Sequence, residues 1–246
     1  MRKPATIPKT MMIYKVIQPK PLTEANVRQM GQKCFDMSSD AIYDSLTVFN
    51  TLKTSTKILN IYPDTGFFNF DLLMQEGEKY STNRDDYPSD DECKKIAIEF
   101  LKNKGLFENN AVDPRVTEQM KSSGYINVGF DSLIGGYKTT GVGRRLRIGV
   151  GPGGTIKYVR KHWIEVEPWK MAPIKTPKEA FNELQEGKAF FMEIDVSKID
   201  EITIRYNVQT YEEGYIQPVY YFSLKKSGGT YILVPAVKSE YIMSDE

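Results

Sequence analysis

The stretch Ser89–Gly105, SDDECKKIAIEFLKNKG, shows how this chain builds its structure. Ser89 and Glu92 form an S-x-x-E capping box, in which each side chain accepts a hydrogen bond from a backbone N–H group at the start of a helix. Gly105 stands where the C-terminal cap is expected. The apolar residues between them recur at helical spacing: Cys93, Ile96, Ala97, Phe100 and Leu101. The stretch therefore predicts a helix with one buried face.

Working outward, the same pattern of a capped helix followed by strands occurs three times. The other two helices are expected to begin after Thr23 and after Thr176, the latter with Pro177 at its first position. The expected strands span residues 11–18, 45–50, 57–62, 67–73, 115–121, 125–133, 144–150, 155–166, 201–210, 216–224 and 230–237. The sheets should be antiparallel because the connections are too short for helical crossovers. We predict an α+β fold of antiparallel meanders, each packed by a single helix, in two to three repeated units.

Two polar or proline-containing stretches are predicted to be linkers. Residues Glu76–Pro88 are polar and acidic, and Pro168 and Pro173 mark a second candidate. We therefore expect an N-terminal β-α-β-β-β unit over 1–80, a helix and long meander over 81–170, and a helix and three-stranded meander over 171–246. The last two are expected to form one structural domain.

Composition excludes several classes of protein. The formal net charge is +1 and 40% of the residues are hydrophobic, so no global field attracts nucleic acid or a membrane surface. No apolar run approaches the roughly 20 residues of a membrane-spanning helix. Cys34 and Cys93 both fall on apolar helix faces, which predicts two buried thiols, with a single disulfide as the alternative.

Catalytic signatures are absent from the sequence. His162 is the only histidine and lies in a predicted strand, and no G-x-S-x-G elbow is present. The glycines at 149–154 precede a strand and not a helix, so they predict a hairpin turn and not a phosphate loop. The acidic cluster is explained by a linker and a helix start: Asp85, Asp86, Asp90, Asp91 and Glu92. We predict no catalytic residue, no cofactor and no metal site.

Charge is separated along the chain. Between Ser132 and Ile164 there are seven basic residues and no acid, whereas Asp64–Glu92 holds nine acids and two bases. The predicted partner-binding face consists of Arg144, Arg145, Arg147, Lys157, Arg160, Lys161 and Trp163. By period two, Arg145 and Arg147 share one strand face, and Lys157 and Lys161 share another.

Three interpretations of these basic strands stay open. They can form a solvated face or pair with the acidic linker, they can attract an acidic protein or anionic lipid, or their aromatic neighbours can stack on single-stranded nucleic acid. We expect no nucleic-acid partner. The C-terminal tyrosines are assigned to core and cross-strand packing, with an exposed edge for strand addition as the alternative: Tyr206, Tyr211, Tyr215, Tyr220, Tyr221 and Tyr231.

The segments "IAIEFLKNKGLF", "YINVGFDSLIGGY", "GVGRRLRIGVGPGGTIKYVRKHW", "IKTPKEAFNELQEGKAF" and "YIQPVYYFSLKKSGGTYILVPAV" together resemble a known family. Over residues Ser89 to Val237 the chain is similar to PepSY-like domains and to YycH/YycI-type regulators of bacterial sensor kinases. The resemblance implies an exported or membrane-anchored regulatory or peptide-binding protein without catalytic residues.

The sequence as a whole predicts a non-catalytic, extracytoplasmic regulatory or binding protein that engages another protein or a peptide. Its partner is expected to be a protein, in one version membrane-anchored, with any signal or anchor absent from this chain. A cytoplasmic location is the alternative. The alternative functions are a carboxylate-based hydrolase, which would bring two acids with raised pKa values together, and a structural module of a surface assembly.

Overall fold

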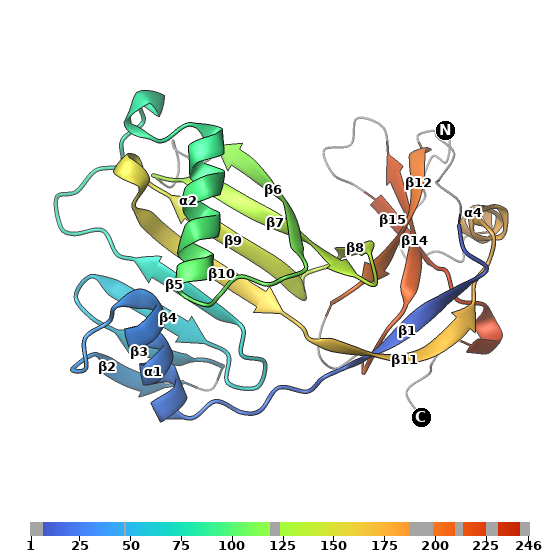
Figure 1. Ribbon diagram of the computed structural model, residues 1–246, viewed down its shortest axis with the longest axis horizontal. Coiled ribbons are helices and arrows are strands. Elements are labelled where there is room, and N and C mark those ends of the chain that lie inside the picture. Colours follow the sequence, from blue (N-terminus) through green and yellow to red (C-terminus); the bar gives the residue numbers. More distant parts are fainter. Residues whose placement is uncertain are drawn as a thin grey trace. The chain divides into compact units, whose positions relative to one another are not determined.

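The computed structural model describes residues 7–46, 48–118, 124–186, 199–209, 214–224 and 231–241 (Figure 1). The chain divides into two compact units. Unit 1 combines Met1–Ile17, Leu133–Val142 and Ile164–Glu246, and unit 2 combines Gln18–Ser132 and Gly143–Trp163. Each unit contains antiparallel sheets packed by helices, which confirms the predicted α+β class. The predicted domain boundaries near residues 80 and 170 stay predictions.

Unit 2 is built on one antiparallel sheet in the order β6-β7-β9-β10-β5-β4-β3-β2. Its strands are β2 (Ile42–Ser45), β3 (Asn50–Lys53), β4 (Lys57–Ile61), β5 (Phe68–Leu72), β6 (Ala111–Glu118), β7 (Ile126–Ile134), β9 (Arg144–Val150) and β10 (Ile156–Trp163). The turn between β4 and β5 is the predicted one, with Gly66 at a φ of 67°.

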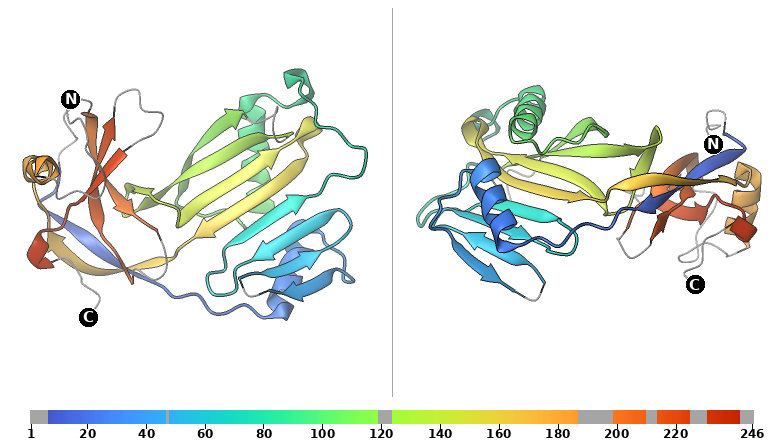
Figure 2. Two further views of the ribbon diagram at one scale, coloured as in Figure 1. Left: turned by 180° about the vertical axis from the view of Figure 1, so that it is seen from behind. Right: turned by 60° about the horizontal axis from the view of Figure 1, so that its bottom comes forward.

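Helices α1 (Glu24–Phe35) and α2 (Asp90–Asn103) cover one face of this sheet (Figure 2). Both begin at the predicted caps, Thr23 and Ser89, and each forms a complete capping box with the residue three positions on. α1 packs on β3, and α2 packs on β6 and β9. One row of paired strand residues forms the floor of the core below them: Val128, Ile148, Val159, Phe70, Leu59 and Leu52.

Unit 1 contains two sheets. A three-stranded sheet has the order β11-β1-β13, with β1 (Thr10–Val16), β11 (Val166–Pro173) and β13 (Tyr215–Ile216). The other runs β15-β14-β12-β8, and its β12–β8 pairing is parallel. Its strands are β8 (Tyr137–Thr140), β12 (Ile199–Asn207), β14 (Pro218–Leu224) and β15 (Tyr231–Pro235). Helix α4 (Pro177–Gln185), capped by Thr176 as predicted, packs on β15.

The segment marked by Pro168 and Pro173, expected to be a linker, lies in strand β11, so that expectation was wrong. β11 pairs with β1 through a bulge, because Tyr14 is opposite Pro168 whereas Ile13 is opposite Lys170. Proline has no N–H group for a ladder and is therefore tolerated at a bulge or on an edge strand. Both conditions hold here, since β11 is an edge of its sheet.

Other predicted boundaries also needed correction. The strand expected over 45–50 does not exist, because β2 ends at Ser45 and β3 begins at Asn50. The strand expected over 155–166 is divided between β10 and β11. The predicted turns at 122–123 and 227–229 and the helix end at Gly187 lie outside the described residues.

Cys34 and Cys93 are buried free thiols, as expected, and form no disulfide. Each Sγ is 3.5 Å from a different backbone carbonyl, that of Lys104 for Cys34 and that of Pro88 for Cys93. Burial raises the pKa of both thiols above its usual value. They therefore behave as small apolar side chains of the unit 2 core.

Candidate functional site

The sheet of unit 2 has one face that no helix of the described chain covers (Figure 2, left). Alternation along β9 creates this open face: Leu146 and Ile148 are fully buried under the helices, whereas Arg145 and Arg147 are exposed on the other side. The predicted sharing of a face by Arg145 and Arg147 is thus observed.

Strand β10 adds further positive charge to the open face. Arg160 lies directly opposite Arg147, and His162 lies directly opposite Arg145. Like charges opposite each other destabilise an antiparallel pair by about 0.2–1 kcal/mol. One ion pair relieves part of this repulsion, because Arg160 Nη2 is 2.9 Å from Asp71 Oδ1. For Arg147 the described residues provide no ion pair or hydrogen bond.

Lys157 joins this face through a β-bulge. Ile156 is opposite Val150 and Tyr158 is opposite Gly149, so Lys157 is an extra residue in β10. A Cβ atom on Gly151 would lie 2.8 Å from the Lys157 side chain, which places that side chain over the backbone of Gly151. We call Arg145, Arg147, Lys157 and Arg160 the basic face.

The remaining predicted residues lie on the helix-covered side. Arg144 and Trp163 are each 7% exposed, and the Arg144 guanidinium is 5.0 Å from the centre of the Trp163 ring. Lys161 Nζ is 2.5 Å from Glu108 Oε1. The expectation that Lys157 and Lys161 share a face was therefore wrong, and the seven predicted residues do not form one surface.

His162 packs face to face on Phe67, with ring centres 4.7 Å apart. Burial lowers the pKa of His162 below its usual value, and the positive charges of Arg145, Arg160 and Arg147 lower it further. The imidazole is therefore uncharged at neutral pH. It packs on Phe67 as a flat ring and does not add a fifth cation to the basic face.

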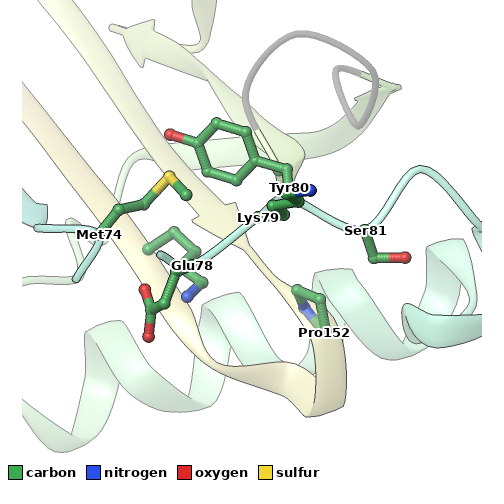
Figure 3. Close-up of a pocket in the computed structure, with 8 residues that line it drawn as sticks. Met74, Glu78, Lys79, Tyr80, Ser81 and Pro152 are labelled. Atoms are coloured by element: carbon green, nitrogen blue, oxygen red, sulfur yellow. The ribbon is translucent and has the colours of Figure 1, made fainter. Parts of the chain in front are cut away.

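A pocket of about 220 Å³ lies in unit 2 where the segment after β5 meets the β9–β10 turn, which contains the short helix η2 (Pro152–Gly154) (Figure 3). A Cβ atom on Gly124 would overlap the Tyr80 ring, so the ring can pack at this position only because residue 124 is a glycine. Glu78 Oε2 accepts a hydrogen bond from the Gln75 backbone N–H at 2.9 Å. The pocket is lined by Met74, Glu78, Lys79, Tyr80, Ser81, Gly124, Pro152 and Lys157.

The sequence predicted a linker for half of the lining residues and named only Lys157 as a functional candidate. The pocket forms where a segment without regular secondary structure meets turns distant in sequence, so no local pattern marks it. The one available signal was the pair of glycine-containing turns at Gly124 and Gly151–Gly154.

The acidic cluster has the structural role that the sequence predicts. Ser89 donates its backbone N–H to Glu92 Oε2 at 2.8 Å, and the hydrogen bonds from Ser89 lower the pKa of Glu92. Arg84, in the short helix η1 (Arg84–Asp86), pairs with Asp90 at 2.9 Å. Within the described ranges, no three His, Cys, Asp or Glu side chains lie where they could hold a metal ion together.

The tyrosines of unit 1 divide between core and surface. Tyr206 and Tyr220 are buried, and their hydroxyl groups donate to the backbone carbonyls of Met12 and Lys175. Tyr221 stacks on Tyr231 at 4.6 Å. Core and cross-strand packing, the favoured interpretation, holds for these four, whereas Tyr211 lies outside the described residues.

No family model and no curated protein matches this chain. Among solved structures, the chain is similar to the YpeB C-terminal domain of Bacillus megaterium, with 12% identity and a TM-score of 0.42. That match covers 89% of this chain and 95% of the other. An uncharacterized protein from Eubacterium rectale ATCC 33656 gives 11% identity and a TM-score of 0.46, covering 92% and 83% of the two chains. These values are too low to transfer a function or a partner.

None of the described helices is long and apolar enough to cross a membrane.

Proposed function

We propose that this protein is a non-catalytic binding protein that recognises an acidic segment of another protein on its basic face. The observation that carries the proposal is the placement of Arg147 directly opposite Arg160 on a sheet face without helices. This arrangement costs folding stability, and an acidic partner would convert the repulsion into attraction.

The spacing of the cations favours an extended acidic segment. Arg145 and Arg147 are two residues apart on β9, which corresponds to about 7 Å. An extended peptide repeats its side chains on one side at the same interval. Carboxylates at every second residue would therefore meet successive arginines.

The described acidic residues leave part of the basic face without a counter-ion. Asp71 pairs with Arg160, and the acids of the 76–92 segment make their contacts elsewhere, such as Asp90 with Arg84 and Asp91 with Lys94. Among the described residues, the acidic linker therefore forms no ion pair with Arg147 or Lys157, and both are available for a partner.

A carboxylate-based hydrolase has less support from the site. Burial raises the pKa of Asp71 above its usual value, as such an enzyme requires of its acid. The neighbour at hydrogen-bond distance, however, is the Arg160 guanidinium and not a second carboxyl group.

The test is fluorescence anisotropy with a fluorescein-labelled peptide of alternating Glu and Ser, compared with the same peptide carrying Gln for Glu. We expect the Glu peptide to bind more tightly, and Arg147→Gln to weaken it about threefold to tenfold, with a loss at high salt. Lys95→Gln removes a cation from the exposed side of α2, where the side chain is 74% exposed, and serves as the matched control. Equal binding of the two peptides, or an equal loss in both variants, would disprove the proposal and favour a structural module.

A regulatory role and an extracytoplasmic location belong to the same proposal. Fractionation of cells that produce the full-length protein tests the location directly. Recovery of the protein in the cytoplasmic fraction alone would contradict it.

A further inference from the structure

Two lysines line the pocket beside the basic face. The described residues offer no hydrogen bond or ion pair to Lys79 or to Lys157, although both line the same cavity of about 220 Å³. A cleft whose lining carries a net charge of one sign concentrates ions of the opposite sign. Two lysines in one lining therefore favour an anion.

The other lining residues indicate the kind of anion. Lys79, Lys157 and Glu78 give the pocket a net charge of about +1, and the Glu78 carboxylate is partly committed to the Gln75 backbone N–H. A single negative charge matches this lining better than a phosphate dianion. Met74, Pro152 and the Tyr80 ring provide an apolar wall beside the cations. A carboxylate next to an apolar side chain has this combination, which is the chemistry of a peptide C-terminus.

We propose that this pocket binds the C-terminal carboxylate and last side chain of the acidic segment that the basic face recognises. This inference rests on the proposed function. The inference adds the direction of the bound peptide and the position of its end. The partner is recognised at its C-terminal end, and the last residue sits between Lys79 and Lys157.

The position of the pocket sets the spacing of the peptide's charges. Lys157 precedes Arg160 by three residues on β10, and Gly151, under the Lys157 side chain, follows Arg147 by four residues. At about 3.3 Å per residue, the pocket is roughly 10–13 Å from the Arg147–Arg160 pair. An extended peptide covers this span with three or four residues. On the side of the peptide that faces the sheet, acidic side chains are therefore expected four and six positions before the C-terminal residue, at the interval of Arg147 and Arg145.

The probe is the fluorescein-labelled peptide Gly-Glu-Ser-Glu-Ser-Gly-Ser-Val, prepared with a free C-terminal carboxylate and with a C-terminal amide. We expect the free acid to bind about twofold to fivefold more tightly than the amide, which is the usual size of one solvent-exposed ion pair. Lys157→Gln and Lys79→Gln should abolish this preference, whereas Lys95→Gln should keep it. Far-ultraviolet circular dichroism and thermal melts confirm that each variant is folded.

The peptide with Gln for both Glu residues separates the two proposals. If Glu is preferred over Gln but the free acid and the amide bind equally, the proposed function stands and the pocket inference is wrong. If neither preference is seen, both are wrong. Inorganic phosphate is then titrated against the labelled free-acid peptide. Displacement at sub-millimolar phosphate that depends on Lys157 would overturn the assignment to a peptide carboxylate in favour of a phosphate site.

Discussion

Arg147 offers a direct test of the idea that the basic face costs stability. It is directly opposite Arg160 in the register of β9 and β10, and the described residues give it no counter-ion. Two unit charges about 7 Å apart in water repel each other by roughly 0.6 kcal/mol, and cross-strand like charges cost about 0.2–1 kcal/mol. Arg147→Thr should therefore raise the free energy of unfolding of unit 2 by about 0.5 kcal/mol.

The control is Arg115→Thr, the same substitution on β6, which pairs with β7 in the same sheet. Arg115 Nη2 is 2.6 Å from Asp131 Oδ2, so this change removes an attraction and should lower the free energy of unfolding by about 0.2–1 kcal/mol. The two substitutions share their effect on side-chain entropy and strand propensity. The opposite sign of their effects therefore isolates the charge.

The assay is urea unfolding followed by tryptophan fluorescence in a Trp169→Phe background. Trp163 belongs to the core of unit 2, whereas Trp169 belongs to unit 1 and is 40% exposed, so the remaining signal reports on unit 2. In about 1 M salt the screening length falls to about 3 Å and both effects should shrink. A destabilising Arg147→Thr, or a gain that persists unchanged in high salt, would refute the electrostatic account.

Two further predictions concern the core and the pH dependence. A Cβ atom on Gly31, in α1, would lie 2.4 Å from Cδ2 of the buried Leu52. Gly31→Ala should therefore lower the free energy of unfolding by about 1–3 kcal/mol in urea titrations, although alanine has the better helix propensity. An unchanged unfolding midpoint would contradict the close packing of α1 on β3. The pKa of His162 is lowered in the folded state, so the unfolded chain takes up a proton that the folded chain does not as pH falls through about 6.5, and stability should fall below that pH. His162→Phe keeps the stacking on Phe67 and should flatten this part of the stability profile between about pH 7 and 5.5, whereas an identical profile in both proteins would assign the loss to other groups.

The helices were predictable from sequence because their signals are local. Thr23, Ser89 and Thr176 each lie next to the backbone N–H groups that they cap, and the apolar residues that follow recur within a few turns. Strand β9 was equally predictable, since Leu146, Ile148 and Val150 recur at every second position of Arg144–Val150. For these elements the pattern and the structure depend on the same short-range geometry.

The prolines were misleading because their effect depends on the position of a strand in its sheet. Pro168 lies in edge strand β11 beside a bulge, and Pro114 lies in edge strand β6, where the register also shifts. In the sequence alone, a proline in an apolar and aromatic stretch indicates an interruption. Only the sheet order shows that the missing N–H group falls where no ladder bond is needed.

The candidate site was predicted in part, and the error in the prediction comes from a single residue. Period two correctly places Arg145 and Arg147 together, and the same rule places Arg144 with the buried Leu146 on the helix side. In β10 the bulge at Lys157 shifts the alternation by one residue, so Lys157 and Lys161, four positions apart, end on opposite faces. That shift brings Lys157 over Gly151 and into the lining of the pocket. The bulge thus links the two halves of the proposed site: without the extra residue, alternation would turn Lys157 to the helix-covered side, and the pocket lining would carry one lysine and one carboxylate.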